Sequence, residues 1–131
     1  MRFLCVGVLL ISSAGMAVAE SAAFLGDTIY SSRAGCEKLQ KLAKGAPRNL
    51  TSVPDTVSAS GHQSWEGGCS ITKIGKKLIG GSWSVTLRCG DGAQENVVRR
   101  ETWKLQRDGS LLVTSKLASD TFTPCRRELA R

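Results

Sequence analysis

Residues 65–89 read WEGGCSITKIGKKLIGGSWSVTLRC and predict the central hairpin of the fold. Glycines mark a turn across residues 75–81, and after the turn the side chains expected on the two faces of a strand alternate along the sequence. Trp83, Val85, Leu87 and Cys89 fall on one face of a strand, whereas Ser84, Thr86 and Arg88 fall on the other. Antiparallel pairing across this turn puts Cys69 opposite Cys89 and Ile71 opposite Leu87, which matches apolar with apolar. We therefore predict a β-hairpin closed by its own disulfide.

The remaining cysteines extend this prediction to the whole domain. Beyond Cys5, which lies in the leading apolar segment, the cysteines are Cys36, Cys69, Cys89 and Cys125. Four cysteines allow three pairings, and a Cys69–Cys89 bond leaves Cys36 with Cys125. Zinc is the competing interpretation, but the wide separations lack the close cysteine pairs of zinc fingers and ribbons. Two disulfides, Cys69–Cys89 and Cys36–Cys125, are the prediction.

The flanking sequence predicts one helix and further strands. Ser31 or Ser32 is a candidate N-cap, apolar residues recur at helical spacing from Cys36, and Gly45 and Pro47 end the helix. From Thr56 onward, short strands alternate with turn signals, the strongest of them Asp108-Gly109. A two-residue turn there sets Leu105 opposite Leu112 and Trp103 opposite Thr114. The predicted strands run over residues 57–65, 68–74, 82–89, 95–106 and 120–127, with one more after Asp108-Gly109. Residues 28–30 are a further candidate for a short strand and are not counted among these six. The fold class is α+β, with one N-terminal helix packed on a twisted antiparallel β-meander or small barrel of about six strands.

The N-terminus has the pattern of a cleavable secretory signal. Arg2 precedes an apolar stretch from Phe3 to Ile11, and Ala17-Val18-Ala19 supplies small residues for cleavage. The apolar run is about half the ~20 residues that a membrane span needs, and Cys5 is misplaced for lipid attachment. We therefore expect a signal peptide at 1–19, a single disulfide-stabilised domain at 20–131, and a periplasmic or secreted location without a lipid anchor or transmembrane segment.

Basic residues dominate the charge. The chain has 18 lysines and arginines against 11 acidic residues, a balance that favours anionic partners. The candidate contacts for an anionic partner are Lys73, Lys76, Lys77, Arg99, Arg100, Arg126 and Arg127. Nucleic acid is disfavoured as the partner because exposed aromatics are scarce and export removes the protein from it. An acidic envelope polymer or another envelope protein is the expected partner.

The sequence predicts no catalytic, cofactor or metal site. His62 and Glu66 share a strand face but lie about 13 Å apart along it, and we interpret His62 as a surface residue. Among the carboxylates Asp55, Glu66, Glu95 and Glu101, no pair is marked as catalytic by its spacing. Glu101, which lies between Arg99 and Trp103 on one face, is predicted to form an ion pair.

Several motifs together resemble small exported proteins of alphaproteobacteria. They are Tyr30 and Cys36 before a short helix, Ser-Trp-Glu-Gly-Gly-Cys at 64–69, Leu-Arg-Cys at 87–89, Glu-Thr-Trp at 101–103 and Pro-Cys at 124–125. The resemblance implies a periplasmic or secreted location and carries over no catalytic residue, because the shared positions are structural.

The leading functional hypothesis is an exported, non-enzymatic binding or accessory domain of the bacterial cell envelope that engages an anionic partner. A periplasmic inhibitor of a lysozyme or protease is the first alternative, and a secreted host-interaction protein is the second. The inhibitor hypothesis is weakened because a basic protein repels a cationic lysozyme, and because the chain lacks the Ser-Gly-Ser-Gly-type loop of known periplasmic lysozyme inhibitors.

Overall fold

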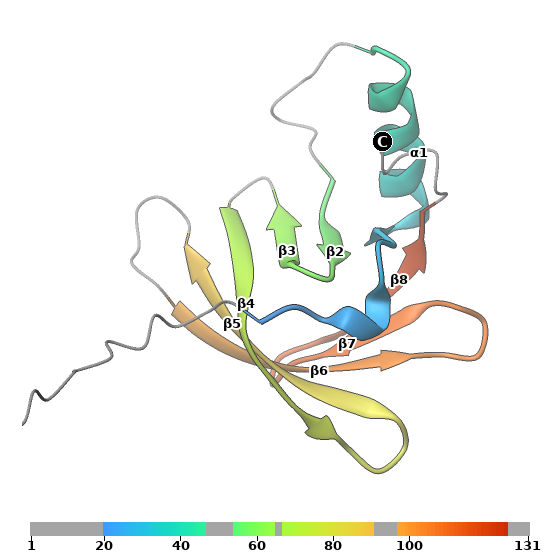
Figure 1. Ribbon diagram of the computed structural model, residues 1–131. Helices are drawn as coiled ribbons and strands as arrows, with labels where there is room; N and C mark the ends of the chain where they lie inside the picture. The colour runs from blue at the N-terminus through green and yellow to red at the C-terminus, as the bar shows by residue number, and fades with distance from the viewer. Residues whose placement is uncertain (1–19, 47–53, 65–66, 91–96, 126–131) are drawn as a thin grey trace, which may run out of the picture.

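The computed structural model describes residues 20–46, 54–64, 67–90 and 97–125, so the expected signal peptide at 1–19 lies outside the described residues. These residues form a closed antiparallel barrel in which each strand pairs with the next along the chain and β8 pairs with β1 (Figure 1). The strands are β1 (Tyr30–Ser31), β2 (Thr56–Ser58), β3 (Gly61–Ser64), β4 (Gly67–Lys77), β5 (Ser82–Gly90), β6 (Val97–Leu105), β7 (Leu111–Thr114) and β8 (Ser119–Pro124), and the helices are the 3-10 turn η1 (Ala23–Leu25) and α1 (Arg33–Ala43).

The predicted hairpin lies at the centre of this barrel wall. Cys69 pairs with Cys89 and Ile71 with Leu87, as the sequence indicated. Both predicted disulfides are present, Cys69–Cys89 between β4 and β5 and Cys36–Cys125 between α1 and the residue after β8. Two irregularities in the β4–β5 pairing allow β4 to continue to Lys77, so the turn is shorter than the predicted 75–81.

The prediction of about six strands was wrong, because the described residues form eight. The described part of the expected strand at 57–65 forms two strands, β2 and β3, joined by a tight turn at Ala59-Ser60, and Trp65 lies outside the described residues. Gly61 makes this turn possible: its φ is +137°, and a Cβ there would lie 1.9 Å from the carbonyl oxygen of Cys69. The two-residue β1 adds the other strand and closes the barrel between β2 and β8.

The turn at Asp108-Gly109 also differs from its prediction. A two-residue turn would place Leu105 opposite Leu112, whereas Leu105 pairs with Leu111. The observed loop has three residues, because the Gln106 N–H donates to the Ser110 carbonyl and the third loop residue, Gly109, has a φ of +88°. A three-residue hairpin loop of this kind shifts the register by one position.

The helix begins as predicted, with the Ser32 side chain accepting a hydrogen bond from the Gly35 N–H. It neither fills the barrel nor covers a sheet face, but contacts β1 and β8 at the rim (Figure 1). Gly35 is the buried residue of the helix, since a Cβ at this position would meet the Ser31 hydroxyl. The α+β expectation therefore becomes a mostly β barrel with one peripheral helix.

Inward-facing side chains fill the barrel, as expected for eight strands. At one end, the segment containing η1 crosses the barrel: the Ala22 N–H donates to the Ala59 carbonyl, and the Phe24 ring stacks on Trp83 with centroids 4.9 Å apart. The buried apolar residues are Ala22, Leu25, Tyr30, Val57, Ile71, Val85, Leu87, Trp103, Leu111 and Val113. In the part of the chain that the structure describes, no helix is long and apolar enough to cross a membrane.

Candidate functional site

The outer face of β4, β5 and β6 gathers basic side chains. On β5 and β6 the buried residues Leu87 and Trp103 mark the inward positions, so the alternate residues point outward. On β4 an irregularity after Ile71 brings Lys73 opposite the outward-facing Thr86. The outward and exposed basic side chains, which we call the basic face, belong to Lys73, Arg88, Arg100 and Lys104.

The register places members of the basic face near one another. Lys73 and Arg100 both pair with Thr86, one from each side, so their Cα atoms lie about 10 Å apart across two strand spacings. Arg88 pairs with Val98 and is thus diagonal to Arg100, a relation that separates Cα atoms by about 7–8 Å. The basic face is therefore a cluster built from three strands.

Among the described residues, strands β4, β5 and β6 add no carboxylate to this face, and the Glu20 carboxylate accepts a hydrogen bond from the Ile74 N–H, next to Lys73. Strands β4, β5 and β6 contain a single acidic residue, Glu101, and its side chain is buried inside the barrel. The outward positions between the cations carry the hydroxyls of Ser84, Thr86 and Thr102. Long cationic side chains interleaved with short hydroxyl side chains give a surface that can donate hydrogen bonds to phosphate or carboxylate oxygens.

The residues predicted to contact an anionic partner do not lie together in the structure. Lys73 and Arg100 lie on the basic face, whereas Lys76 and Lys77 lie exposed at the far end of β4. Arg99 points to the opposite side of the sheet from Arg100, where it pairs with Glu101. Arg126 and Arg127 lie outside the described residues.

Sequence reasoning did not select Arg88 and Lys104, although both belong to the basic face. Each is an isolated cation in the sequence and therefore did not stand out beside the Lys76-Lys77 and Arg99-Arg100 pairs. The signal that identifies them is strand alternation, which already placed Arg88 on the face opposite to Leu87.

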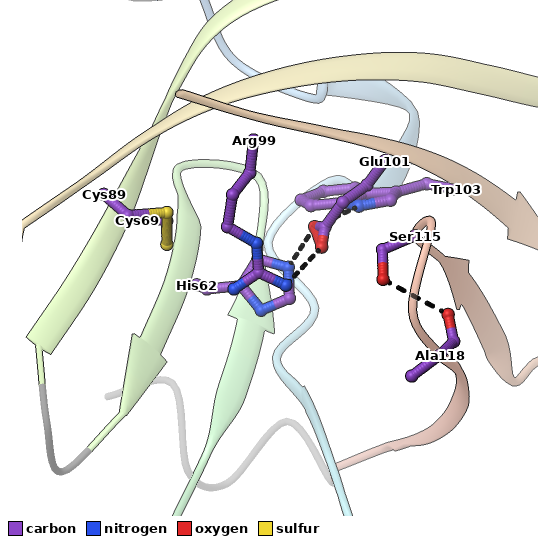
Figure 2. Close-up of polar contacts among 8 residues, drawn as sticks. All are labelled: His62, Cys69, Cys89, Arg99, Glu101, Trp103, Ser115 and Ala118. Atoms are coloured by element: carbon purple, nitrogen blue, oxygen red, sulfur yellow. Dashed lines mark hydrogen bonds and ion pairs between the residues drawn. A yellow bond between two sulfur atoms is a disulfide. The ribbon is translucent and has the colours of Figure 1, made fainter. Parts of the chain in front are cut away.

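A second polar cluster lies on the inside of the barrel, around Glu101 (Figure 2). The Glu101 side chain is 1% exposed, and its Oε1 atom is 2.7 Å from His62 Nε2 and 3.2 Å from Trp103 Nε1. Arg99 donates to Oε2 at 3.3 Å, which confirms the predicted ion pair. The carboxylate thus accepts hydrogen bonds from three side chains.

His62 is not the surface residue that we expected. Its side chain is 18% exposed, and its ring makes edge contacts with Trp103 and Phe122 at centroid distances of 5.6 and 6.3 Å. The partner of His62 is Glu101, 39 residues away on β6, and Glu66 lies outside the described residues. This contact across the barrel has no counterpart in local sequence spacing.

The cluster holds the Glu101 carboxyl in its ionised form. Burial alone would raise the pKa of Glu101, but His62, Trp103 and Arg99 act in the opposite direction and lower the pKa below its usual value. An ionised carboxylate only accepts hydrogen bonds, so His62 Nε2 carries the proton that it donates to Glu101.

The pKa of Glu101 predicts how stability depends on pH. A lowered folded-state pKa means that the stability contributed by Glu101 is fully present above the unfolded-state value of about 4.3. It is lost as the pH falls through the lower folded-state value. We expect the difference in unfolding free energy between the wild type and Glu101→Gln to shrink below about pH 4. Urea denaturation at several pH values measures this difference, and a constant difference from pH 6 to pH 3 would contradict the assignment.

In this cluster the Glu101 carboxylate fixes the orientation of the His62 imidazole. A carboxylate that orients a histidine is one half of many acid–base sites. Among the described residues, however, no hydroxyl or thiol is hydrogen-bonded to His62, and Cys69, its neighbour on β4, is bonded to Cys89. No group of three or more potential metal ligands occurs in the described part of the chain.

Comparison with known proteins found no match among protein-family models, curated proteins or solved structures.

Proposed function

We propose that the protein is an exported, non-enzymatic binding domain of the bacterial envelope that attaches to an anionic polymer through its basic face. The carrying observation is the gathering of Lys73, Arg88, Arg100 and Lys104 on three adjacent strands, with the one acidic residue of these strands turned inward. The two disulfides fit an oxidising compartment.

The geometry supports recognition of a repeating anion. Cations spaced at strand and diagonal distances can contact successive charged groups of one polymer, and each contact adds to the next. A rigid barrel wall keeps the Cα positions of these cations fixed, which limits the conformational entropy lost on binding. Since the side chains are exposed, the attraction should be strongly screened by salt.

A binding role also suits the interior cluster. The His62–Glu101 contact links β3 to β6 across the barrel, and Arg99 and Trp103, on the same strand as Glu101, satisfy the remaining acceptor capacity of the carboxylate. Such a satisfied network stabilises one arrangement of these strands. We therefore assign this cluster to structure and the outer basic face to binding.

The basic face can be tested with a charge-matched pair of variants. The first carries Lys73→Gln, Arg88→Gln and Arg100→Gln. The control carries Lys38→Gln, Lys41→Gln and Lys116→Gln, on α1 and the β7–β8 turn, and loses the same net charge. On immobilised alginate, a polycarboxylate polysaccharide, the wild type and the control should be retained at low salt, and the basic-face variant should elute at clearly lower salt.

Two outcomes would contradict the proposal. Equal elution of the two variants would show that only net charge matters, and absence of retention of the wild type at low salt would show that the face does not bind a polycarboxylate. Circular dichroism of all three proteins checks that the fold is unchanged. Titration into a lysozyme or protease assay tests the inhibitor alternative, which predicts loss of enzyme activity.

A further inference from the structure

The tip of the β4–β5 hairpin exposes two aliphatic side chains. Leu78 is 46% exposed and Ile79 is 104% exposed, so Ile79 has no neighbour that shields it. The hairpin extends beyond the other strands of the barrel (Figure 1). An aliphatic side chain that is fully exposed at a projecting tip suggests a contact that the isolated domain does not make.

The tip has a defined backbone conformation. The Leu78 N–H donates to the Ser82 carbonyl at 2.7 Å, and the Gly81 N–H donates to the Leu78 carbonyl at 3.1 Å. Gly80 and Gly81 have φ values of +91° and +83°, which residues with a Cβ rarely adopt. The loop therefore presents Ile79 outward in the free protein, and little ordering is needed when the side chain is buried by a partner.

Two lysines adjoin the aliphatic pair. Lys76 and Lys77 precede Leu78 directly and are both exposed, and within the described residues neither makes a salt bridge. The tip thus combines a short apolar end with cations one or two residues behind it. This order of groups matches the order of acyl chains and phosphates in an anionic lipid leaflet.

The size of the apolar tip favours a membrane over a protein partner. A specific protein interface buries about 800 Å² on each side, more than two aliphatic side chains provide. Insertion of side chains by about 5–10 Å into the boundary between headgroups and acyl chains needs no such area.

We propose that Leu78 and Ile79 insert into an anionic lipid bilayer, while Lys76 and Lys77 contact its phosphates. This inference goes beyond the proposed function, because it involves other residues and a lipid instead of a polymer. The barrel itself stays outside the bilayer, since its outer face carries the charged residues described above.

The test measures flotation with vesicles. The wild type should bind vesicles of phosphatidylglycerol and phosphatidylcholine, and the double variant Leu78→Ser/Ile79→Ser should bind them about tenfold or more weakly, because two aliphatic side chains are lost from the bilayer. Leu117→Ser is the matched control: Leu117 is 97% exposed on the β7–β8 turn, at the other end of the barrel. This control should bind like the wild type.

Additional variants and vesicles distinguish insertion of the aliphatic side chains from electrostatic attraction by the lysines. Lys76→Gln/Lys77→Gln should weaken binding to anionic vesicles, and binding of the wild type to pure phosphatidylcholine should be much weaker. An added tryptophan in Ile79→Trp should be quenched by brominated acyl chains, relative to the wild type. Equal vesicle binding by the wild type and Leu78→Ser/Ile79→Ser, or no quenching at position 79, would overturn the inference.

Polymer binding by the basic face and membrane insertion by the hairpin tip can be refuted independently of each other. The Leu78→Ser/Ile79→Ser variant should be retained on alginate as the wild type is, because its basic face is intact. Loss of alginate retention in the basic-face variant without the expected loss of vesicle binding in the tip variant would refute the membrane inference alone.

Discussion

Glu101→Ala should lower the free energy of unfolding by about 3–5 kcal/mol, the range for breaking a buried charged pair. The alanine removes the acceptor for His62, Trp103 and Arg99 at once. The indole N–H of Trp103, which is buried, would then have no acceptor among these side chains, and an unsatisfied buried donor is costly. Urea denaturation followed by circular dichroism measures the loss.

The neighbouring residue provides the control for Glu101. Thr102→Ala changes a half-buried, outward-facing side chain of the same strand and should cost less than about 1 kcal/mol. Glu101→Gln should fall between the two, since an amide oxygen can still accept from one donor. A loss for Glu101→Ala as small as that for Thr102→Ala would show that the cluster adds nothing to stability.

Removing the Cys36–Cys125 disulfide should also lower the free energy of unfolding by a large amount. The bond spans 89 residues, and the chain-entropy model assigns such a loop about 4.5 kcal/mol, against about 3 kcal/mol for the 20-residue separation of Cys69–Cys89. The bond also fixes α1 beside β8, next to the short pairing that closes the barrel. Cys36→Ser/Cys125→Ser should therefore destabilise the fold more than Cys69→Ser/Cys89→Ser.

Denaturation of the two serine double variants under the same conditions checks this order. The reverse order would show that strain or residual structure outweighs loop length. A drop in helical signal confined to the Cys36→Ser/Cys125→Ser variant, with the strand signal intact, would instead show that the bond holds only α1.

Local patterns in the sequence were enough for the hairpin, the helix and both disulfides. Alternation after residue 82 and the turn glycines determine how Cys69 meets Cys89, and the Ser32 cap determines where α1 begins. These features depend on residues close together in the chain, or on counting cysteines. The predicted number of strands was too low because the short candidate at 28–30, which overlaps the two-residue β1, was not counted. It was also too low because the Ala59-Ser60 turn lacks the Asn-Gly or Asp-Gly signal of a tight hairpin.

The two clusters were harder to predict. The basic face depends on which way each residue of adjacent strands points, so Arg99 and Arg100 separate although they are neighbours in the sequence. The cluster around Glu101 depends on barrel closure, which brings His62 to a residue 39 positions away. Neither relation follows from spacing until the complete strand order is known.

The closure of the barrel between β1 and β8 also bears on aggregation. Among the described residues, every strand pairs with a neighbour on each side over at least part of its length. In these paired segments the backbone N–H and C=O groups are not free to pair with another chain, whereas β4 after Ile71 has no partner on its β3 side and β6 before Thr102 has none on its β7 side. The two-residue β1 makes the shortest strand pairings of the barrel, and loss of these pairings would expose the edges of β2 and β8. Reduction of the neighbouring Cys36–Cys125 bond should therefore promote edge-to-edge association as well as lower stability.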